Sequence, residues 1–220
     1  MVPGSRHGPG GLSLHPDDLV RRAPRLFHTT PAASWPGIAT HGLLPVAGLL
    51  DLFGVTGDER ERLLTTRRPR AVRLHHPEHG IAWLRDQRPL NPAALGRMLD
   101  PGSGFGVADY LRRINGCAFL WADPARLRRL HALPRYADTE HVVLTVDTAS
   151  LVAAHGDRVL VTRINSGAAL FAQGRRGPDT FLPVGRVPSS WRPVEVAVPG
   201  GVRDLLAHLV DAPAVPERSG

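Results

Sequence analysis

The sequence contains no lysine, a single cysteine and no long apolar run. The lone Cys117 excludes an internal disulfide and any metal site built from a cluster of cysteines. It lies in the apolar stretch CAFLW, which favours a buried core thiol. No stretch approaches the roughly 18 consecutive apolar residues of a transmembrane helix, so we expect no membrane partner.

The N-terminal stretch MVPGSRHGPGGLSLHPDD lacks the basic start and apolar run of a signal peptide, so we expect a cytoplasmic protein. A chain of 220 residues can form one domain with a substantial core. We expect a disordered lead over residues 1–22, one folded domain over 23–209 and a flexible tail over 210–220.

The net charge is +7, and all 27 basic residues are arginines. Arginine binds phosphates through its planar fork and stacks on bases, so this charge permits a nucleic-acid or nucleotide-phosphate partner. The alternative explanation is compositional, because a GC-rich genome also enriches arginine, alanine, glycine and proline without lysine. Charge alone therefore leaves nucleic-acid binding open.

Several familiar sites are absent: the chain has no G-x-G-x-x-G, no G-x-x-x-x-G-K-[ST], no G-x-S-x-G and no H-E-x-x-H motif. The segment LHHPEHG contains His75, His76, Glu78 and His79, which could ligate a metal. Adjacent side chains on a strand point to opposite faces, so His75 and His76 cannot easily share an ion. A solvated hairpin turn is favoured, and we expect no metal site.

Short elements alternate along the chain without a strict strand–helix–strand order. The predicted strands are Arg25–Thr30, Ala71–His75, Ile81–Leu84, Cys117–Trp121, Val142–Val146, Val159–Ile164 and Val194–Val198. The predicted helices include Ser34–Gly42, Ala47–Phe53, Glu59–Leu64, Pro92–Leu99, Val107–Ile114 and a closing helix at Val202–Leu209. This order predicts an α+β fold with a mixed, largely antiparallel sheet.

Polar residues at strand ends are the first candidates for a site. His28, Thr29 and Thr30 end the first predicted strand, just before a helix. They are either ordinary strand-end and capping residues or one wall of a ligand site. Arg85 follows the apolar run IAWL and could bind a phosphate in bidentate fashion, or could pair with Asp86 on the surface.

Glu195 is the remaining candidate, within the late strand VEVAV. It alternates with Val194 and Val196 and therefore faces away from the valine side of that strand. This pattern alone favours a solvent-facing carboxylate.

Many short motifs, kept in one order, resemble an uncharacterised bacterial domain family over about residues 25–205. The motifs are H-T-T…W-x-x-I…H-G-L-L, L-R-D-Q-x-P-L, F-x-W…R-L, H-x-V-L-x-V-D-T-x-S-L, I-N-S-G and R-G…T-F. They stand here at His28–Thr30 with Trp35, Ile38 and His41–Leu44; Leu84–Leu90; Phe119–Trp121 with Arg126 and Leu127; His141–Leu151; Ile164–Gly167; and Arg176–Gly177 with Thr180 and Phe181.

This family is similar in plan to the DarT-type ADP-ribosyltransferases, which attach ADP-ribose from NAD to DNA bases. The resemblance implies an ADP-ribosyltransferase-like fold, with the sheet split around a cleft that binds NAD. It assigns NAD binding to His28, Thr29 and Thr30 on the first strand. An arginine in the middle of the chain would hold the NAD phosphates or the transition state; Arg85 matches best and Arg73 is the alternative.

The same resemblance implies that Glu195 is the catalytic carboxylate and that Asn165 and Ser166 lie on the substrate side. Two departures stand out. The turn at Asn165 is only loosely similar, and the F-x-W strand lacks the Asn-Pro pattern that follows its DarT counterpart. The resemblance further implies a bacterial toxin or defence enzyme acting on DNA or RNA, with an antitoxin or immunity protein of unknown identity as a further partner.

Two other functions remain open from the sequence. One is a related reaction on the same fold, the removal of an RNA 2′-phosphate with NAD. The other is a non-catalytic module that recognises nucleic acid or protein through its basic surface. The enzyme requires His28, Arg85 and Glu195 to converge on one pocket, whereas in a binding module Glu195 points to open solvent, away from His28. Trp35 and Ile38 are expected to pack their helix under the first strand.

Overall fold

The computed structural model describes residues 13–132, 140–172 and 174–211. In these ranges the α-helices are α1 (Pro16–Arg22), α2 (Trp35–His41), α3 (Val46–Leu52), α4 (Gly57–Thr65), α5 (Pro92–Met98), α6 (Val107–Asn115), α7 (Pro124–His131) and α8 (Thr148–His155). The strands are β1 (Arg25–Pro31), β2 (Val72–His76), β3 (Gly80–Leu84), β4 (Cys117–Trp121), β5 (His141–Asp147), β6 (Leu160–Thr162), β7 (Leu182–Pro183), β8 (Glu195–Pro199) and β9 (Leu209–Asp211). No helix within these ranges is long and apolar enough to cross a membrane.

A seven-stranded sheet with the order β7-β6-β8-β4-β1-β5-β9 forms the centre of the described chain. Each neighbouring pair in it is antiparallel. Strands β2 and β3 form a separate antiparallel hairpin, as the sequence predicted. The α+β class with a largely antiparallel sheet is thus confirmed.

The junction between β1 and β4 is the weakest pairing near the centre of the sheet. Strand β1 pairs with β5 at seven positions but with β4 only at Phe27–Trp121. Beyond that pair the His28 ring bonds to the backbone oxygen of Phe119 on β4. The sheet is therefore continuous. At the junction of β1 and β4, however, its two halves are joined by the Phe27–Trp121 pair and by the His28 hydrogen bond.

Both faces of the sheet are covered by apolar clusters. On β4, Ala118 and Leu120 point into a cluster shared with α1, α2 and α8, while Cys117 and Phe119 point into one shared with α5 and α6. This alternation confirms that Cys117–Trp121 is a central strand buried on both faces. Burial also raises the pKa of the Cys117 thiol to about 11, so it is the core thiol that its apolar context predicted.

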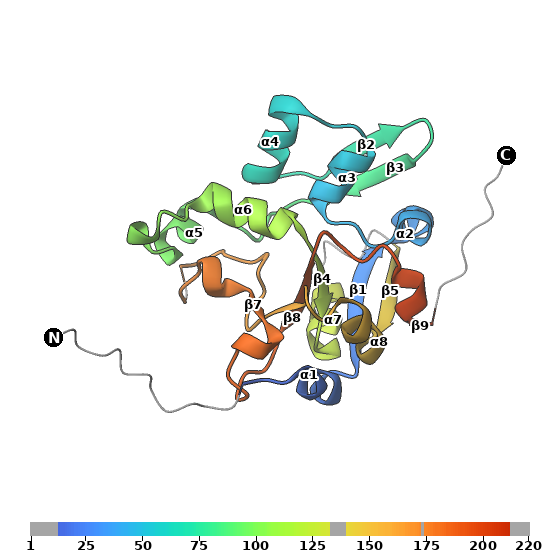
Figure 1. Ribbon diagram of the computed structural model, residues 1–220. Coiled ribbons are helices and arrows are strands. Elements are labelled where there is room, and N and C mark those ends of the chain that lie inside the picture. The colour runs from blue at the N-terminus through green and yellow to red at the C-terminus, as the bar shows by residue number, and fades with distance from the viewer. Residues whose placement is uncertain (1–12, 133–139, 173, 212–220) are drawn as a thin grey trace.

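A third cluster holds a separate group of elements together. Helices α3 and α4 pack on the β2–β3 hairpin through residues that include Leu50, Phe53 and Leu84. Figure 1 shows this group at the top of the molecule, above the sheet, with α5 and α6 to its left. Segment 85–90 leads from the hairpin to α5, so residues near its start lie between the upper group and the sheet.

Helix α2 is fixed directly after β1. Trp35 is buried in the cluster on the first sheet face and Ile38 packs against that cluster, as predicted. The helix ends at Gly42, whose φ of +80° favours glycine, and a Cβ there would lie 2.4 Å from the Cα of Arg203. The backbone at Gly42 thus lies so close to the backbone at Arg203 that only glycine fits, and this contact holds the end of α2 in place.

Two sequence predictions about the ends of the domain were wrong. Residues 16–22 form α1 rather than a disordered lead, because Leu14 and Leu19 are fully buried and His15 caps the helix. The predicted closing helix at Val202–Leu209 is a 3-10 turn, Leu205–His208, followed by β9, which pairs with the edge strand β5. Strand β9 extends to Asp211, beyond the expected start of the tail; residues 1–12 and 212–220 lie outside the described part of the chain.

Candidate functional site

A cavity of about 490 Å³ lies between the sheet and the upper group of elements. It is lined by His28–Thr30 of β1, Arg85 after β3, the turn residues Asn165 and Ser166, and Glu195 of β8. A volume of this size is within the range of roughly 300–1,000 Å³ typical of small-molecule sites. The structure therefore brings together residues that the sequence could name only one by one.

The His28 ring has a defined donor and a defined acceptor. Its Nδ1 lies 2.9 Å from the backbone oxygen of Phe119, and because a carbonyl only accepts, Nδ1–H must donate. Loss of hydration around the ring lowers the pKa of His28; the hydrogen bond to Phe119 partly opposes this shift, and the nearby positive charge of Arg85 adds to it. The ring is therefore neutral near pH 7, with Nε2 as a hydrogen-bond acceptor.

Glu195 is buried, with only 4% of its surface exposed. Its Oε2 accepts two hydrogen bonds from Ser166, one from the backbone N–H at 3.1 Å and one from the hydroxyl at 2.7 Å. Both of these hydrogen bonds are accepted by the same carboxylate oxygen. The solvent-facing position favoured by the valine alternation was wrong, because α5 and α6 cover the sheet face to which Glu195 points.

The environment of Glu195 sets the charge of its carboxyl group. Burial raises the pKa of Glu195 to about 7, while the Ser166 hydrogen bonds and the guanidinium of Arg176 partly oppose this rise. Near neutral pH the group therefore exists both as acid and as carboxylate. A carboxyl group with this pKa can exchange a proton with a ligand or stabilise a positive charge.

Arg176 holds the turn that binds Glu195. Arg176 is buried, which is rare for an arginine. Its guanidinium donates to the Tyr110 hydroxyl at 2.6 Å and to the Ser166 carbonyl at 2.9 Å. It also donates to the carbonyl oxygens of Asn165 and Ala168. The Tyr110 hydroxyl also donates to the Ser166 carbonyl, at 3.1 Å, so Arg176 and Tyr110 together hold the turn that positions the Ser166 donors.

A second buried arginine supports Arg85. Arg68 donates to the backbone oxygen of Arg85 at 3.2 Å, to that of Leu63 at 2.7 Å, and to Oδ1 of Asn115 at 2.9 Å. Gln87 accepts from the backbone N–H of Arg68 at 3.0 Å. Burial lowers the pKa of the Arg68 guanidinium to about 10, so it stays charged at neutral pH.

The sequence did not single out Arg68 or Arg176 as site residues. Arg176 stands in a motif of the family resemblance, but neither lies in a recognisable binding pattern, and both reach the site only through tertiary contacts. Arg73, the alternative phosphate-binding residue, is exposed on β2 opposite Trp83 and does not line the cavity. Asp86 pairs with Arg88, with an Nε–Oδ1 distance of 3.6 Å.

Burial of Glu195 makes the stability of the fold depend on pH. The folded state keeps the carboxyl proton up to about pH 7, whereas an unperturbed glutamate releases it near 4.5. Between these values the folded state binds more protons than the unfolded chain, so stability falls as the pH rises through about 7. Between about pH 5 and pH 8 we expect the wild type to lose on the order of 3 kcal/mol of unfolding free energy relative to Glu195→Gln, measured by urea unfolding.

The comparison with Glu195→Gln isolates this effect. The lowered pKa of His28 acts in the opposite direction, since its neutral form is favoured on folding, but it acts in both proteins. A free-energy difference between the two proteins that stays constant across this pH range would contradict the buried, protonated state of Glu195.

The fold and the site define an α+β protein with an antiparallel sheet and a cavity whose lining includes neutral His28, Arg85 and buried Glu195. A family model matches residues 24–209, so the chain belongs to the family described as "Family of unknown function (DUF7002)". No curated protein and no solved structure gives a significant match to the chain.

Proposed function

We propose that the protein is an NAD-dependent ADP-ribosyltransferase-like enzyme that transfers ADP-ribose to a macromolecule such as DNA or RNA. The observation that carries this proposal is the shared cavity of His28, Arg85 and buried Glu195. Its volume suits a ligand of cofactor size, and its polar groups come from separate elements that converge on it. The family resemblance stated above points to the same residues.

The chemistry of the transfer matches these groups. The bond between ribose C1′ and the nicotinamide nitrogen breaks, nicotinamide leaves with the bonding electrons, and positive charge develops on the ribose. Glu195, held by two Ser166 donors, stabilises that charge, because a fixed carboxylate near a developing cation lowers the barrier. The acceptor then bonds to C1′, and its proton passes to the carboxylate of Glu195.

The other two groups bind rather than react. The acceptor nitrogen Nε2 of neutral His28 suits a ribose hydroxyl, which can donate to it. The guanidinium of Arg85 suits the pyrophosphate, because its planar fork binds two phosphate oxygens at once. Both groups thus orient NAD so that C1′ faces Glu195.

The alternative is a non-catalytic binding module, for which we expect Glu195 to point to open solvent. Its 4% exposure and its place in the cavity favour the enzyme instead.

The direct test is transfer of labelled ADP-ribose. The full chain is incubated with NAD labelled on its adenylate group, separately with single-stranded DNA, RNA and a protein mixture. We expect label on one class of acceptor together with release of nicotinamide. Neither label transfer nor nicotinamide release with any acceptor, from protein that is folded by circular dichroism, would refute the proposal.

Arg85 and Arg73 form a matched pair for the cofactor site. Arg85→Ala removes one of the arginines that line the cavity, beside Arg68 and Arg88, and is expected to weaken NAD binding by about tenfold to 150-fold, as for a lost charge-assisted hydrogen bond of about 1.5–3 kcal/mol. Arg73→Ala, on the exposed face of β2, should leave the affinity unchanged. Isothermal titration with NAD measures both. Equal affinities for the two variants would remove Arg85 from the proposed site.

A further inference from the structure

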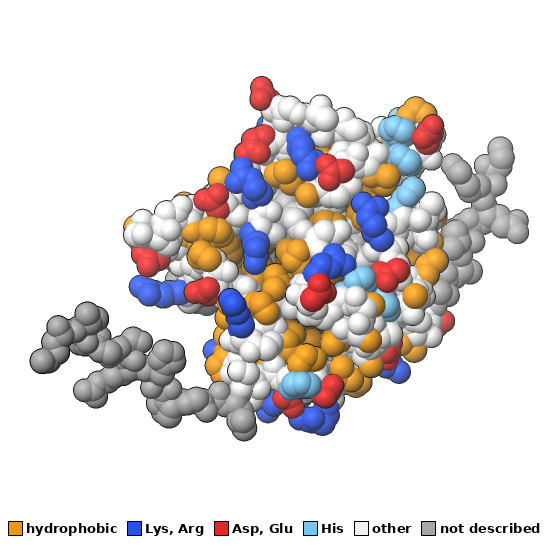
Figure 2. Space-filling view, in the orientation of Figure 1, with side chains coloured by type: hydrophobic (Ala, Val, Ile, Leu, Met, Phe, Trp, Pro, Cys, Tyr) orange, Lys and Arg blue, Asp and Glu red, His pale blue; other side chains and the backbone are white. Residues whose placement is uncertain are grey.

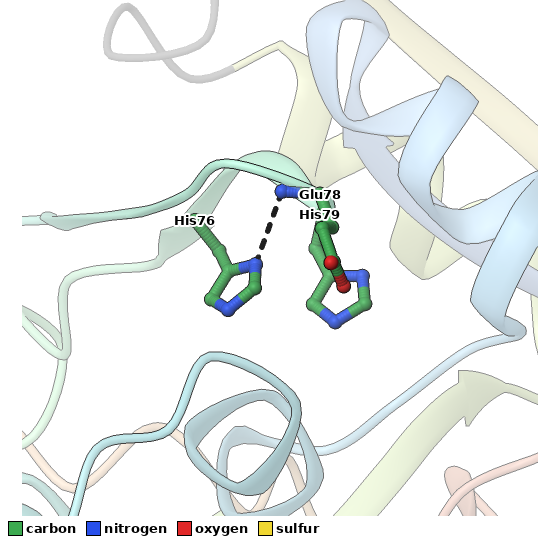
Figure 3. A group of neighbouring side chains, drawn as sticks. All are labelled: His76, Glu78 and His79. Carbon is green, nitrogen blue, oxygen red and sulfur yellow. Dashed lines mark hydrogen bonds between the residues drawn. The ribbon is translucent and has the colours of Figure 1, made fainter.

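A group of histidines lies at the turn of the β2–β3 hairpin, beside the cavity. His76 is the last residue of β2, and Glu78 and His79 belong to the turn. Figure 3 shows the two imidazole rings side by side, both pointing to the same side of the turn, with the carboxylate of Glu78 next to the His79 ring. In Figure 2 histidine side chains gather at the upper right, where Figure 1 places this turn.

The turn geometry, rather than the strand, brings these rings together. Gly80 has a φ of +69°, a conformation that favours glycine, so the chain reverses immediately after His79. The rings of His76 and His79 are stacked, with centroids 4.5 Å apart and an interplanar angle of 20°. Because His75 and His76 are adjacent on β2, they point to opposite faces and cannot easily share an ion. His76 and His79 are brought together by the turn, so this restriction does not apply to them.

The polar atoms of this group have few other partners. His76 Nδ1 accepts a long hydrogen bond of 3.2 Å from the Glu78 backbone N–H. Neither the His79 ring nor the Glu78 carboxylate forms a hydrogen bond or ion pair with any residue in the described ranges. A cation that binds a ring nitrogen of His76 therefore displaces only one weak contact.

We propose that His76, Glu78 and His79 form a binding site for a divalent transition-metal ion of the Zn²⁺ type. One ligand atom of each residue lies within 4.8 Å of those of the other two. Two ligands of a tetrahedral Zn²⁺ are about 3.3 Å apart, given metal–ligand distances of about 2.0–2.1 Å, so an exposed turn has to close by roughly an ångström. Two imidazoles and one carboxylate are a donor set that such ions prefer.

A second group of similar composition lacks these properties. His155, Asp204 and His208 also have ligand atoms close together. However, Asp204 already accepts from both rings, and the guanidinium of Arg158 lies 2.8 Å from Nδ1 of His155. A cation there would have to displace these bonds beside an existing positive charge. This group is a hydrogen-bonded network between α8 and the 3-10 turn, and it serves as a control.

The location of the hairpin site gives the ion a role. His79 lines the cavity, and the ring of His41, at the end of α2, meets the His79 ring edge-on at 5.0 Å between centroids. An ion on the turn fixes the hairpin next to α2 at the edge of the cavity. The inference does not depend on NAD use, because the metal site is built from residues outside the proposed catalytic group.

Metal titration tests this inference with the full chain. Protein freed of metal with a chelator is titrated with Zn²⁺ against a chromophoric chelator, and with Co²⁺, whose visible absorption reports its coordination geometry. We expect one ion per chain for the wild type. His76→Ala and His79→Ala should each weaken binding by at least about tenfold, and Glu78→Gln should weaken it measurably.

The controls separate this site from other causes of metal binding. His75→Ala changes a neighbouring histidine on the opposite face, and Asp204→Asn disrupts the second group; both should bind the ion as the wild type does. Circular dichroism verifies that each variant is folded. Absence of stoichiometric binding by the wild type, binding unaffected in both His76→Ala and His79→Ala, or binding lost in Asp204→Asn would overturn the inference.

Discussion

Glu195→Gln is expected to reduce the rate of ADP-ribose transfer by about 10²–10³-fold, the usual effect of removing one fixed electrostatic group from a transition state. The amide keeps the size of the side chain and can still accept from Ser166 through its oxygen, but it carries no negative charge. The developing ribose cation therefore loses its stabilising partner. Nicotinamide release and label transfer, measured with the acceptor that the wild type modifies, give the rate.

The effect has to be separated from loss of binding or folding. NAD should still raise the melting temperature of Glu195→Gln, because His28 and Arg85 remain in the cavity. Glu140→Gln, a change in an exposed glutamate before β5, should keep the wild-type rate. A transfer rate for Glu195→Gln within about twofold of the wild type would exclude Glu195 as the group that stabilises the transition state.

Arg176→Met is expected to lower the unfolding free energy by about 3–5 kcal/mol, since it removes the four hydrogen bonds that the buried guanidinium donates to Tyr110, Ser166, Asn165 and Ala168. Methionine keeps much of the length of the side chain but donates no hydrogen bond to Ser166, Asn165 or Ala168. For a domain of this size, the melting temperature should fall by about 6–20 °C. Differential scanning calorimetry and urea unfolding measure the two quantities.

The neighbouring arginine provides the control. Arg175 is exposed, and Arg175→Ala should change stability by less than about 0.5 kcal/mol. Because Arg176 holds the turn that carries the Ser166 donors, its variant should also lose most transfer activity under conditions where it is still folded. Similar stabilities for Arg176→Met and Arg175→Ala would show that the buried guanidinium contributes nothing to the turn.

Local patterns were sufficient for most of the secondary structure. The apolar run Cys117–Trp121 is a central strand, and the two short runs around HPEHG form a hairpin, because period and turn residues act over a few positions. The ends of the domain were predicted less well. Residues 16–22 contain too few apolar positions to indicate a helix alone, and α1 is stabilised by burying Leu19 against other elements.

For the site, too, the sequence predicted some residues and missed others. Strand-end polarity drew attention to His28 and Arg85, and both line the cavity. The valine alternation around Glu195 gave the wrong environment, because alternation reports which face is apolar and not whether the other face is covered. No local pattern marked Arg68 or Arg176 as a site residue, since their hydrogen-bond partners lie in other elements or across a turn.

The sequence by itself determined the class of the fold, the position of its central strand and a short set of polar residues at strand ends. Those features follow from periodicity and turn chemistry, which depend on neighbours along the chain. Only the tertiary structure decided that His28 and Glu195, on strands separated by β4, line one cavity, and that His76 meets His79 rather than His75. Both outcomes depend on how strands pair and where a chain reverses, and long-range pairing is set by packing of the whole core rather than by any local pattern.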